Sequence, residues 1–373
     1  MFNLFKPKCQ KIAELMQRAN SLYRSKDYDS AIILYQKILK LDANHYAAIG
    51  NIATSYFYSQ KYDNAIPYLQ KLIEIDSANS WWYNFLSQSY FHTKDYDNSL
   101  NMAFNAVKKA PSDNNHHLNL AYTIYEIADE LGAKKIHSIL KKWYVEFPQN
   151  CVAKQCYKSF FYDKEFVSSD IKYVETLFDS FASDFDNVLK DLEYNSPQII
   201  AQKIALFVKP FSSILDLGCG SGLCAQAIKK NVPECKIIGV DISAKMIEKA
   251  KEKNIYYKLV KSDITTCFNK IKSRCDAVVA SDVFTYFGTL DSLFNKVASF
   301  LPKGGIFAFS VSQNTVNKKD FFLLPCSRFV HSEKYVQKLL DKTGFGVVEN
   351  HVCVIRKEGG KDVVGNIFLC MKK

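Results

Sequence analysis

The sequence lacks any long hydrophobic run. Nowhere in its 373 residues does an apolar stretch reach the ~18 residues that a membrane-spanning helix needs. The opening MFNLFKPKCQK also lacks an apolar core of signal-peptide length ahead of its charged residues. We therefore expect no membrane span and a cytoplasmic location.

The cysteines lack the regularity of a disulfide framework. There are eleven, an odd number without a repeating spacing, which is typical of small buried hydrophobic residues in a reducing compartment. Cys219 and Cys224 lack metal-ligand spacing with any histidine. We expect no metal site.

The basic residues lack the interleaved aromatic residues that are typical of RNA-binding segments. The net charge is +11, and lysines are dense between Lys229 and Arg274. Solvated faces of helices and turns account for these lysines better than a nucleic-acid surface does. Nucleic acid is therefore not an expected partner.

The overall composition is that of a folded globular protein. Apolar residues make up 48% of the chain, charged residues 23% and aromatic residues 14%, which excludes disordered and fibrous classes. A length of 373 residues exceeds the usual size of one hydrophobic core, so we expect about two domains.

A period of 34 residues runs through the first part of the chain. It places Tyr28, Tyr62 and Tyr96 in the similar segments KDYDSAIILYQKILKLD, QKYDNAIPYLQKLIEID and KDYDNSLNMAFNAVKKAP. Two sets of small residues keep the same period: Ala19, Ala53, Ser87 and Ala121, and Ala31, Ala65, Ser99 and Ala133. Helices pack closely only where their crossing lacks bulk. Residues 1–150 are therefore predicted to form about four helical hairpins of an all-α solenoid, the fourth one degenerate.

These positions, together with Pro111, resemble those of tetratricopeptide repeat proteins over roughly residues 10–148. The tryptophan-leucine-glycine signature of that family is absent from the first helix of each unit. The resemblance implies that the repeats bind a protein partner or a protein substrate. In the segment WWYNF we favour packing between repeats over a ligand-binding patch, and Trp81 and Trp82 point to different helix faces, so they cannot be equally buried.

The period is lost after Pro148. Residues 151–176 include the aromatic-bearing segment CVAKQCYKSFFYDKEFVSSDIKYVE, which predicts an irregular connector that is docked rather than a free tether. The second domain is expected over residues 177–373.

Short apolar segments alternate with helical ones from Phe211 onward. SSILDLG, CKIIGVD, YYKLVKSD, CDAVVASD and GGIFAFSVS are typical of strands, and helices are predicted between them. This alternation predicts a Rossmann-like α/β domain with a seven-stranded, mostly parallel sheet. Residues 347–373 predict two strands joined at Gly359 and Gly360, an antiparallel hairpin at the sheet edge.

The segment ILDLGCGSGLCAQAIKK places a bare backbone between the first strand and the first helix, where open α/β sheets bind ligands. Gly218, Gly220 and Gly222 have the spacing G-x-G-x-G, and Leu223 stands where a dinucleotide fingerprint has its third glycine. Asp216 would repel a pyrophosphate. It suits a cationic ligand that carries an amino acid, such as S-adenosylmethionine.

Two further acids follow the next strands. Asp241 in IIGVDIS could accept hydrogen bonds from both ribose hydroxyls, and Asp263 in LVKSDIT could accept from the adenine amino group. A strand-end aspartate is often only a helix cap, and this alternative stays open for Asp241. Three acids after three successive strands, with the glycine turn, favour the cofactor.

Residues 178–373 resemble class I S-adenosylmethionine-dependent methyltransferases through DLGCGSG, GVDIS, SDIT and ASDVFTYFG. With the segments at 177–200 and 328–345, the whole chain is similar to bacterial methyltransferases that carry N-terminal tetratricopeptide repeats. The resemblance implies S-adenosyl-L-methionine as cofactor. It also implies these cofactor-binding residues: Asp216, Gly218, Cys219, Gly220, Gly222, Asp241, Ile242, Met246, Asp263, Ile264, Ser281 and Tyr194.

Methyl transfer requires in-line approach of a nucleophile within a cavity that excludes water. The candidates for a lid are the aromatic residues Phe178, Phe181, Phe185 and Tyr194, although phenylalanines at helical spacing are also typical of a core. If the acceptor requires a base, the catalytic candidates are Asp282, Tyr286 and His331. A capping or packing role for His331 stays open.

Three functions fit these features. We predict a methyltransferase whose repeats recruit or orient a protein. The alternatives are a methyltransferase for a small-molecule acceptor, with repeats that serve oligomerisation, and a repeat scaffold with a non-catalytic cofactor-binding domain. The unbroken set of Asp216, the three glycines, Asp241 and Asp263 argues against the scaffold.

Overall fold

The computed structural model describes residues 7–161, 166–271, 273–358 and 360–373. The chain divides into two compact units, Met1–Ala153 and Lys154–Lys373. The predicted repeats end at residue 150, just before this division. Among the described residues, no helix combines the length and the apolar character that crossing a membrane requires.

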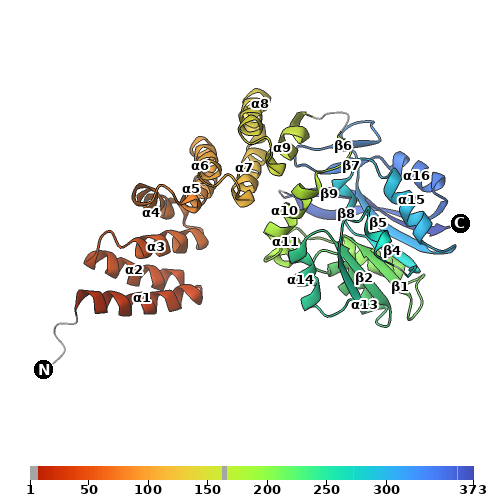
Figure 1. The fold of residues 1–373 in the computed structure, drawn as a ribbon, viewed down its shortest axis with the longest axis horizontal. Helices are drawn as coiled ribbons and strands as arrows, with labels where there is room; N and C mark the ends of the chain where they lie inside the picture. The colour runs from red at the N-terminus through yellow and green to blue at the C-terminus, as the bar shows by residue number, and fades with distance from the viewer. Residues whose placement is uncertain (1–6, 162–165, 272, 359) are drawn as a thin grey trace. The chain divides into compact units, whose positions relative to one another are not determined.

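The first unit consists of helices joined in pairs by short turns (Figure 1). The pairs are α1 (Lys8–Arg24) with α2 (Tyr28–Leu41), α3 (Tyr46–Tyr58) with α4 (Tyr62–Ile75), α5 (Ser80–His92) with α6 (Tyr96–Lys109), and α7 (Asn114–Glu126) with α8 (Ala128–Glu146). The periodic tyrosines each begin the second helix of a pair. The predicted all-α solenoid of hairpins is thereby confirmed.

The period extends to the backbone of the turns. Lys26, Gln60 and Lys94 have left-handed φ values of 63°, 60° and 63°, at equivalent places before α2, α4 and α6. In the first and third turns the next residue, Asp27 or Asp95, caps the following helix through its side chain. The same local chemistry therefore ends one helix and starts the next.

The small periodic residues lie at the helix crossings in the first three pairs. Ala19, Ala31, Ala53 and Ala65 are fully buried, as are Ser87 and Ser99 of the third pair, whose hydroxyl oxygens lie 3.5 Å apart. The fourth pair departs from this pattern. Ala121 is half-buried and Ala133 is exposed, and the backbone is non-helical at Gly132 with φ 72°.

The adjacent tryptophans of α5 differ in burial, as predicted. Trp82 packs on Tyr46 of the preceding repeat, and its indole Nε1 donates a hydrogen bond of 2.7 Å to the tyrosine hydroxyl. Trp81 is 43% exposed. Packing between repeats therefore explains the position of Trp82, whereas the Trp81 ring is largely exposed.

The segment predicted as an irregular connector contains helices, so that prediction is wrong in part. Helix α9 spans Cys151–Phe161, and α10 (Ile171–Phe181) begins before residue 176. The hydrogen-bond acceptor that starts α10 is the side chain of Asp170. Two more helices, α11 (Phe185–Asp191) and α12 (Ser196–Ile204), precede the first strand.

The second unit is built on a seven-stranded sheet in the order β3-β2-β1-β4-β5-β9-β8. The strands are β1 (Ser213–Leu217), β2 (Lys236–Asp241), β3 (Lys258–Lys261), β4 (Ala277–Ala280), β5 (Ile306–Ser312), β8 (Phe345–Glu358) and β9 (Lys361–Lys372). The first five are parallel, and β9 runs antiparallel to β5 and β8. The predicted sheet with its antiparallel edge hairpin is confirmed; Gly359, within the predicted turn, lies outside the described residues.

The sheet is covered on both faces. Neighbouring residues of β1 alternate between two cores: Leu215 packs with α15 (Asp291–Phe300) and α16 (Glu333–Lys342), and Ile214 packs with α12 and α13 (Leu223–Asn231). Helix α14 (Ala244–Glu252) connects β2 to β3. A short η1 turn (Cys267–Asn269) and η2 turn (Phe284–Tyr286) follow β3 and β4.

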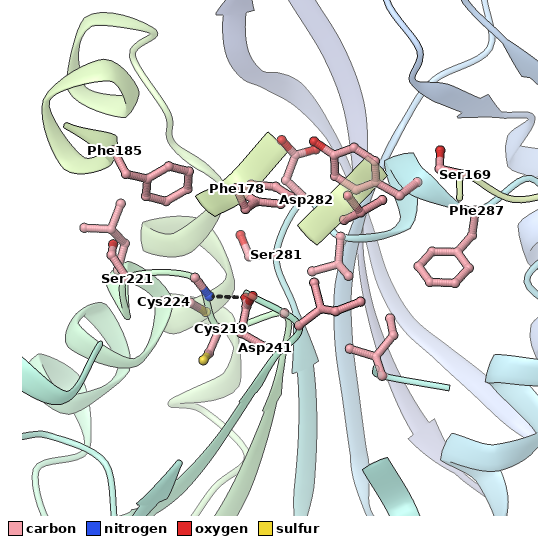
Figure 2. A pocket seen from close by; sticks show the side chains of 18 of the residues that line it. Ser169, Phe178, Phe185, Cys219, Ser221, Cys224, Asp241, Ser281, Asp282 and Phe287 are labelled. Atoms are coloured by element: carbon pink, nitrogen blue, oxygen red, sulfur yellow. Dashed lines mark hydrogen bonds between the residues drawn. The ribbon is translucent and has the colours of Figure 1, made fainter. Parts of the chain in front are cut away.

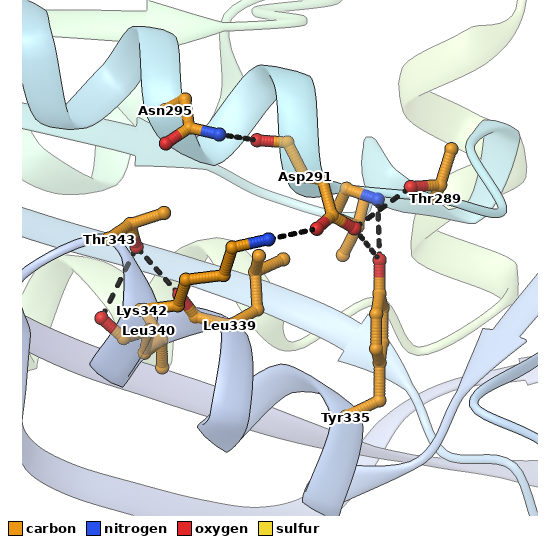
Figure 3. Close-up of polar contacts among 9 residues, drawn as sticks. Thr289, Asp291, Asn295, Tyr335, Leu339, Leu340, Lys342 and Thr343 are labelled. Carbon is orange, nitrogen blue, oxygen red and sulfur yellow. Dashed lines mark hydrogen bonds and ion pairs between the residues drawn. The ribbon is translucent and has the colours of Figure 1, made fainter.

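Asp291 at the start of α15 joins this helix to α16 (Figure 3). Its carboxylate accepts hydrogen bonds of 3.0 Å from the hydroxyls of Tyr335 and Thr289 and pairs with Lys342 at 3.5 Å. Burial by itself would raise the pKa of Asp291, but these donors outweigh it and lower the pKa. Helix α16 follows a two-stranded antiparallel sheet of β6 (Phe321–Leu323) and β7 (Phe329–His331).

Candidate functional site

A cavity of about 290 Å³ lies at the carboxyl ends of the parallel strands (Figure 2). The strand order reverses between β1 and β4, which is where open α/β sheets form their ligand crevice. Of the residues that the sequence predicts for the cofactor, nine line this cavity: Tyr194, Gly218, Cys219, Gly220, Asp241, Ile242, Asp263, Ile264 and Ser281.

The glycine turn has a backbone that other residues rarely adopt. The φ values of Gly218, Gly220 and Gly222 are 65°, 52° and 95°. A Cβ on Gly218 would lie 2.5 Å from Val283, and one on Gly220 would lie 3.4 Å from Phe185. A side chain at Gly218 would therefore collide with Val283, whereas at Gly220 the left-handed backbone rather than lack of space disfavours one, and the turn presents main chain to the cavity. Gly222, which caps α13, lies outside the cavity lining.

Asp241 ends β2 with its carboxylate at the cavity. One oxygen accepts from the Gly220 N–H at 2.8 Å and the other from the Ser243 N–H at 2.9 Å. Helix α14 is capped by Ser243, whose Oγ accepts from the Met246 N–H at 3.0 Å. The cap alternative for Asp241 is thus wrong, and each carboxylate oxygen keeps acceptor capacity beyond these bonds. Burial raises the pKa of Asp241 to about 6, although the backbone donors oppose the rise.

Two of the predicted cofactor residues lie behind the cavity lining. Asp216 is 1% exposed and accepts a hydrogen bond of 2.8 Å from the Tyr256 hydroxyl. Burial raises the pKa of Asp216 to about 7, and the tyrosine bond only partly opposes it. Met246 is fully buried. The ring of Tyr256 also lies 3.0 Å from where a Cβ of Gly222 would stand, so it supports the glycine turn.

Two of the three catalytic candidates, Asp282 and Tyr286, line the cavity just after the end of β4. Asp282 has a left-handed φ of 57° and its N–H donates to the Ser310 Oγ at 2.8 Å, a strained backbone that the surroundings must hold. The hydroxyls of Tyr194 and Ser281, which also line the cavity, form a hydrogen bond of 2.7 Å.

His331, the third catalytic candidate, does not line the cavity. It is fully buried on β7, and its Nε2 lies 3.1 Å from the carbonyl oxygen of Gly288. Burial lowers the pKa of His331 to about 4, although this carbonyl opposes the change. A neutral imidazole in this place fits the packing alternative.

The aromatic residues predicted to form a lid lie on α10 and α11, apart from Tyr194, which follows α11. Phe178 and Phe185 line the cavity with ring centroids 6.0 Å apart, and Phe178 contacts Tyr286 at 5.5 Å. Phe181 is 46% exposed and lies outside the lining. Helical spacing along the chain could not show that Phe178 lines the cavity while Phe181 of the same helix is exposed.

Carboxylates fasten this lid to the glycine turn and to α14. Asp186 of α11 accepts from the Ser221 hydroxyl and from Lys253 Nζ at 2.7 Å. Asp179 of α10 accepts from the hydroxyl of Ser243, which is the residue that also contacts Asp241. The lid is thus tied to the residues that shape the cavity.

Two arginines of the cavity lining were not singled out by the sequence. Arg356 lies on β8 and Arg328 follows β6, and both line the cavity. Arg356 pairs with Asp282 at 2.6 Å and with Glu358 at 3.3 Å, and Arg328 pairs with Glu358 at 3.5 Å. No local motif marks them, since the strands that bring them to the cavity are remote in sequence. Among the described residues, no group of three His, Cys, Asp or Glu side chains could hold a metal ion.

Family comparisons match both units. Residues 214–305 match the family described as Methyltransferase domain, and residues 12–45 and 46–79 each match a family described as Tetratricopeptide repeat. These matches confirm the two resemblances that the motifs and the period indicated.

Curated relatives match the second part of the chain. The malonyl-[acyl-carrier protein] O-methyltransferase 1 of Ilyobacter polytropus is 32% identical over 181 residues, which is 46% of this chain and 63% of the relative. The trans-aconitate 2-methyltransferase of Afipia carboxidovorans is 26% identical over 125 residues, 34% of this chain and 44% of the relative. The chain therefore spans less than two thirds of the length of these relatives.

Among solved structures, the magnesium protoporphyrin IX methyltransferase of Synechocystis with bound SAM is similar with a TM-score of 0.42 and 17% identity. The similarity covers 55% of this chain and 98% of that one.

Proposed function

We propose that this chain, which joins tetratricopeptide repeats to a class I methyltransferase domain, transfers a methyl group from S-adenosylmethionine to an acceptor in the cavity. The observation that carries the proposal is the placement of Asp241. Its carboxylate is held at the cavity by the Gly220 and Ser243 N–H groups, beside a turn of left-handed glycines in which a side chain at Gly218 would collide with Val283.

The residues present fit this cofactor. The Gly218–Gly220 backbone provides the close approach that a methionine portion requires, and Asp241 has free lone pairs for ribose hydroxyls. Asp263 and Ile264 line the cavity where the adenine would bind. When bound, the cofactor supplies an electrophilic methyl group on a sulfonium.

The chain's own aromatic residues exclude water. Phe178, Phe185 and Tyr286 enclose the cavity, and Tyr194 is held by Ser281. Exclusion of water strengthens the electrostatic contacts at the reacting atoms and protects the methyl group from hydrolysis.

The repeats, in this proposal, recruit a protein partner or a protein that carries the acceptor. Support comes from the repeat family itself and from aromatic side chains that the solenoid leaves exposed, Tyr58, Trp81 and Tyr122. Single exposed aromatic residues are ordinary, but large aromatic side chains are also what protein interfaces favour. A small-molecule acceptor with repeats that serve assembly is the competing outcome. We place the reaction in the cytoplasm because the odd number and irregular spacing of the cysteines are typical of a reducing compartment.

Calorimetric titration tests the cofactor. S-adenosylhomocysteine should bind, whereas NAD should show no measurable binding. The Asp241→Ala variant should bind S-adenosylhomocysteine at least about tenfold more weakly, because hydrogen bonds to a charged group contribute roughly 1.5–3 kcal/mol each. Asp341→Asn, an exposed carboxylate on α16, is the control. Tighter binding of NAD, or full affinity in Asp241→Ala, would show the proposal to be wrong.

A further inference from the structure

We infer that the acceptor carries a carboxylate and that Arg328 binds it, an inference that rests on the proposed function.

The turn that carries Arg328 is built firmly. It connects β6 to β7, and its backbone closes with hydrogen bonds from the Leu324 N–H to the Arg328 carbonyl at 2.8 Å and from the Ser327 N–H to the Leu324 carbonyl at 2.9 Å. Beneath it, Phe166, Leu323 and Phe329 form a small buried cluster. A side chain that projects from such a turn is positioned by the fold rather than by a flexible loop.

Arg356 is occupied by protein carboxylates. Its guanidinium pairs with both oxygens of Asp282, at 2.8 and 2.6 Å, and with Glu358 at 3.3 Å, and only 3% of its side chain is exposed. Its Nε is nevertheless buried without a partner among the described residues. Arg356 is therefore engaged by the protein, and this unpaired donor is buried rather than open to the cavity.

Arg328 forms fewer ion pairs with protein carboxylates than Arg356 does. Within the described parts of the chain its one ion pair is the 3.5 Å contact with Glu358, a carboxylate that it shares with Arg356. A guanidinium has five N–H donors in a planar fork that matches a carboxylate. Arg328 lines the cavity, so its remaining donors are available to an anion there.

Among the described residues, none of the three base candidates is free for an acceptor that must lose a proton. His331 lies outside the lining, the Asp282 carboxylate is bound to Arg356, and burial raises the pKa of the Tyr286 hydroxyl, which therefore stays protonated. A carboxylate acceptor requires no base. Its oxygen lone pair forms the new O–C bond to the methyl group, the C–S bond breaks, and that electron pair stays on sulfur. The products are a methyl ester and S-adenosylhomocysteine, and no proton is released.

The test uses the full chain loaded with S-adenosylhomocysteine and titrated with malonate, succinate and trans-aconitate, and separately with malonamide and succinamide as uncharged analogues. We expect at least one carboxylate to bind about tenfold or more tightly than the amides. Arg328→Gln should abolish this preference, and Arg328→Lys should keep part of it, because a lysine retains the charge without the fork. Arg274→Gln, an exposed arginine, is the matched control.

The outcomes separate this inference from the proposed function. If S-adenosylhomocysteine does not bind, the proposed function is wrong. If it binds with ordinary affinity but no carboxylate is preferred, or the preference survives in Arg328→Gln, only the carboxylate inference is overturned. Should Arg328→Gln fail to fold, Arg328→Lys serves as the test: a weakened preference for carboxylates supports the inference, and an unchanged preference overturns it.

Discussion

Two buried carboxylates, Asp216 and Asp241, stand where folding opposes their ionisation. Burial raises their pKa values to about 7 and about 6, against roughly 3.9 in an unfolded chain. The folded state therefore binds more protons than the unfolded state over this range. The stability that each contributes is full below the unfolded pKa and is lost as pH rises through the folded pKa. His331 acts in the opposite direction, since its lowered pKa costs stability as pH falls.

Asp216→Asn should therefore stabilise the ligand-free chain relative to wild type, and more at about pH 8 than at about pH 5, because the variant has no charge to bury. Tyr256 can still bond the amide. Hydrogen exchange of the β1 and β2 amides measures this in the second unit alone. Asp291 is the control, because its pKa is lowered rather than raised in the folded chain. The stability difference between Asp291→Asn and wild type should therefore be the same at both pH values. If the stability gain of Asp216→Asn were equal at the two pH values, the prediction would be wrong.

Residue types and spacing predicted the parts of the site that are local in sequence. The glycine turn and Asp241 follow strands directly, so their strand-end position could be inferred from the motif. The direction of a side chain could not, and for this reason Asp216 and His331 lie behind the lining. Arg356 reaches the cavity through the order of the large sheet, which places β8 beside β9 and β9 beside β5, whereas Arg328 reaches it from the separate sheet of β6 and β7.

At the scale of elements, α11 lines the cavity with Phe185 and Leu189. Its Asp186 carboxylate holds the Ser221 hydroxyl and Lys253. This carboxylate is about half exposed, and a partly exposed ion pair contributes only modestly to stability.

We predict that Asp186→Asn increases the dissociation rate of S-adenosylhomocysteine a few-fold and changes the free energy of unfolding little, because a partly exposed ion pair contributes modestly. Stopped-flow displacement measures the rate. Asp191→Asn, exposed at the end of the same helix, should dissociate like wild type. An unchanged rate in Asp186→Asn would mean that α11 does not act as a lid.

The helices of the first unit were predictable because each hairpin repeats both its small residues and its turn. Helix α9 was missed for the converse reason. It follows the last repeat, and its aromatic residues keep no period. Its start is capped by Asn150, whose side chain accepts from the Val152 and Ala153 N–H groups at 2.9 and 3.0 Å, but a single asparagine outside the period did not by itself predict a helix. The fourth hairpin kept the spacing but lost the burial of its small residues at the kink of Gly132.

At the scale of the whole molecule, the second unit depends on residues ahead of its sheet. The Ser169 N–H donates to the Tyr286 carbonyl at 2.9 Å, and the Gly288 N–H donates to the Val167 carbonyl at 2.8 Å. Ser159 contacts the Pro325 carbonyl beside Arg328 at 3.2 Å. The stretch before α10 therefore supports both the cavity wall and the turn that carries Arg328.

A chain that begins at Cys151 should for this reason bind S-adenosylhomocysteine within a few-fold of the full chain. A chain that begins at Ile171 should be less stable and bind more weakly, since it lacks these contacts.

The chain that begins at Cys151 also tests the role of the repeats, because it lacks them. With methyl-labelled cofactor, the chain from Cys151 should label the small-molecule fraction of a cell extract as the full chain does, but it should label the protein fraction less, because loss of a second binding site lowers the effective concentration of a bound acceptor. Equal labelling of the protein fraction, with a change in sedimentation instead, would assign the repeats to assembly.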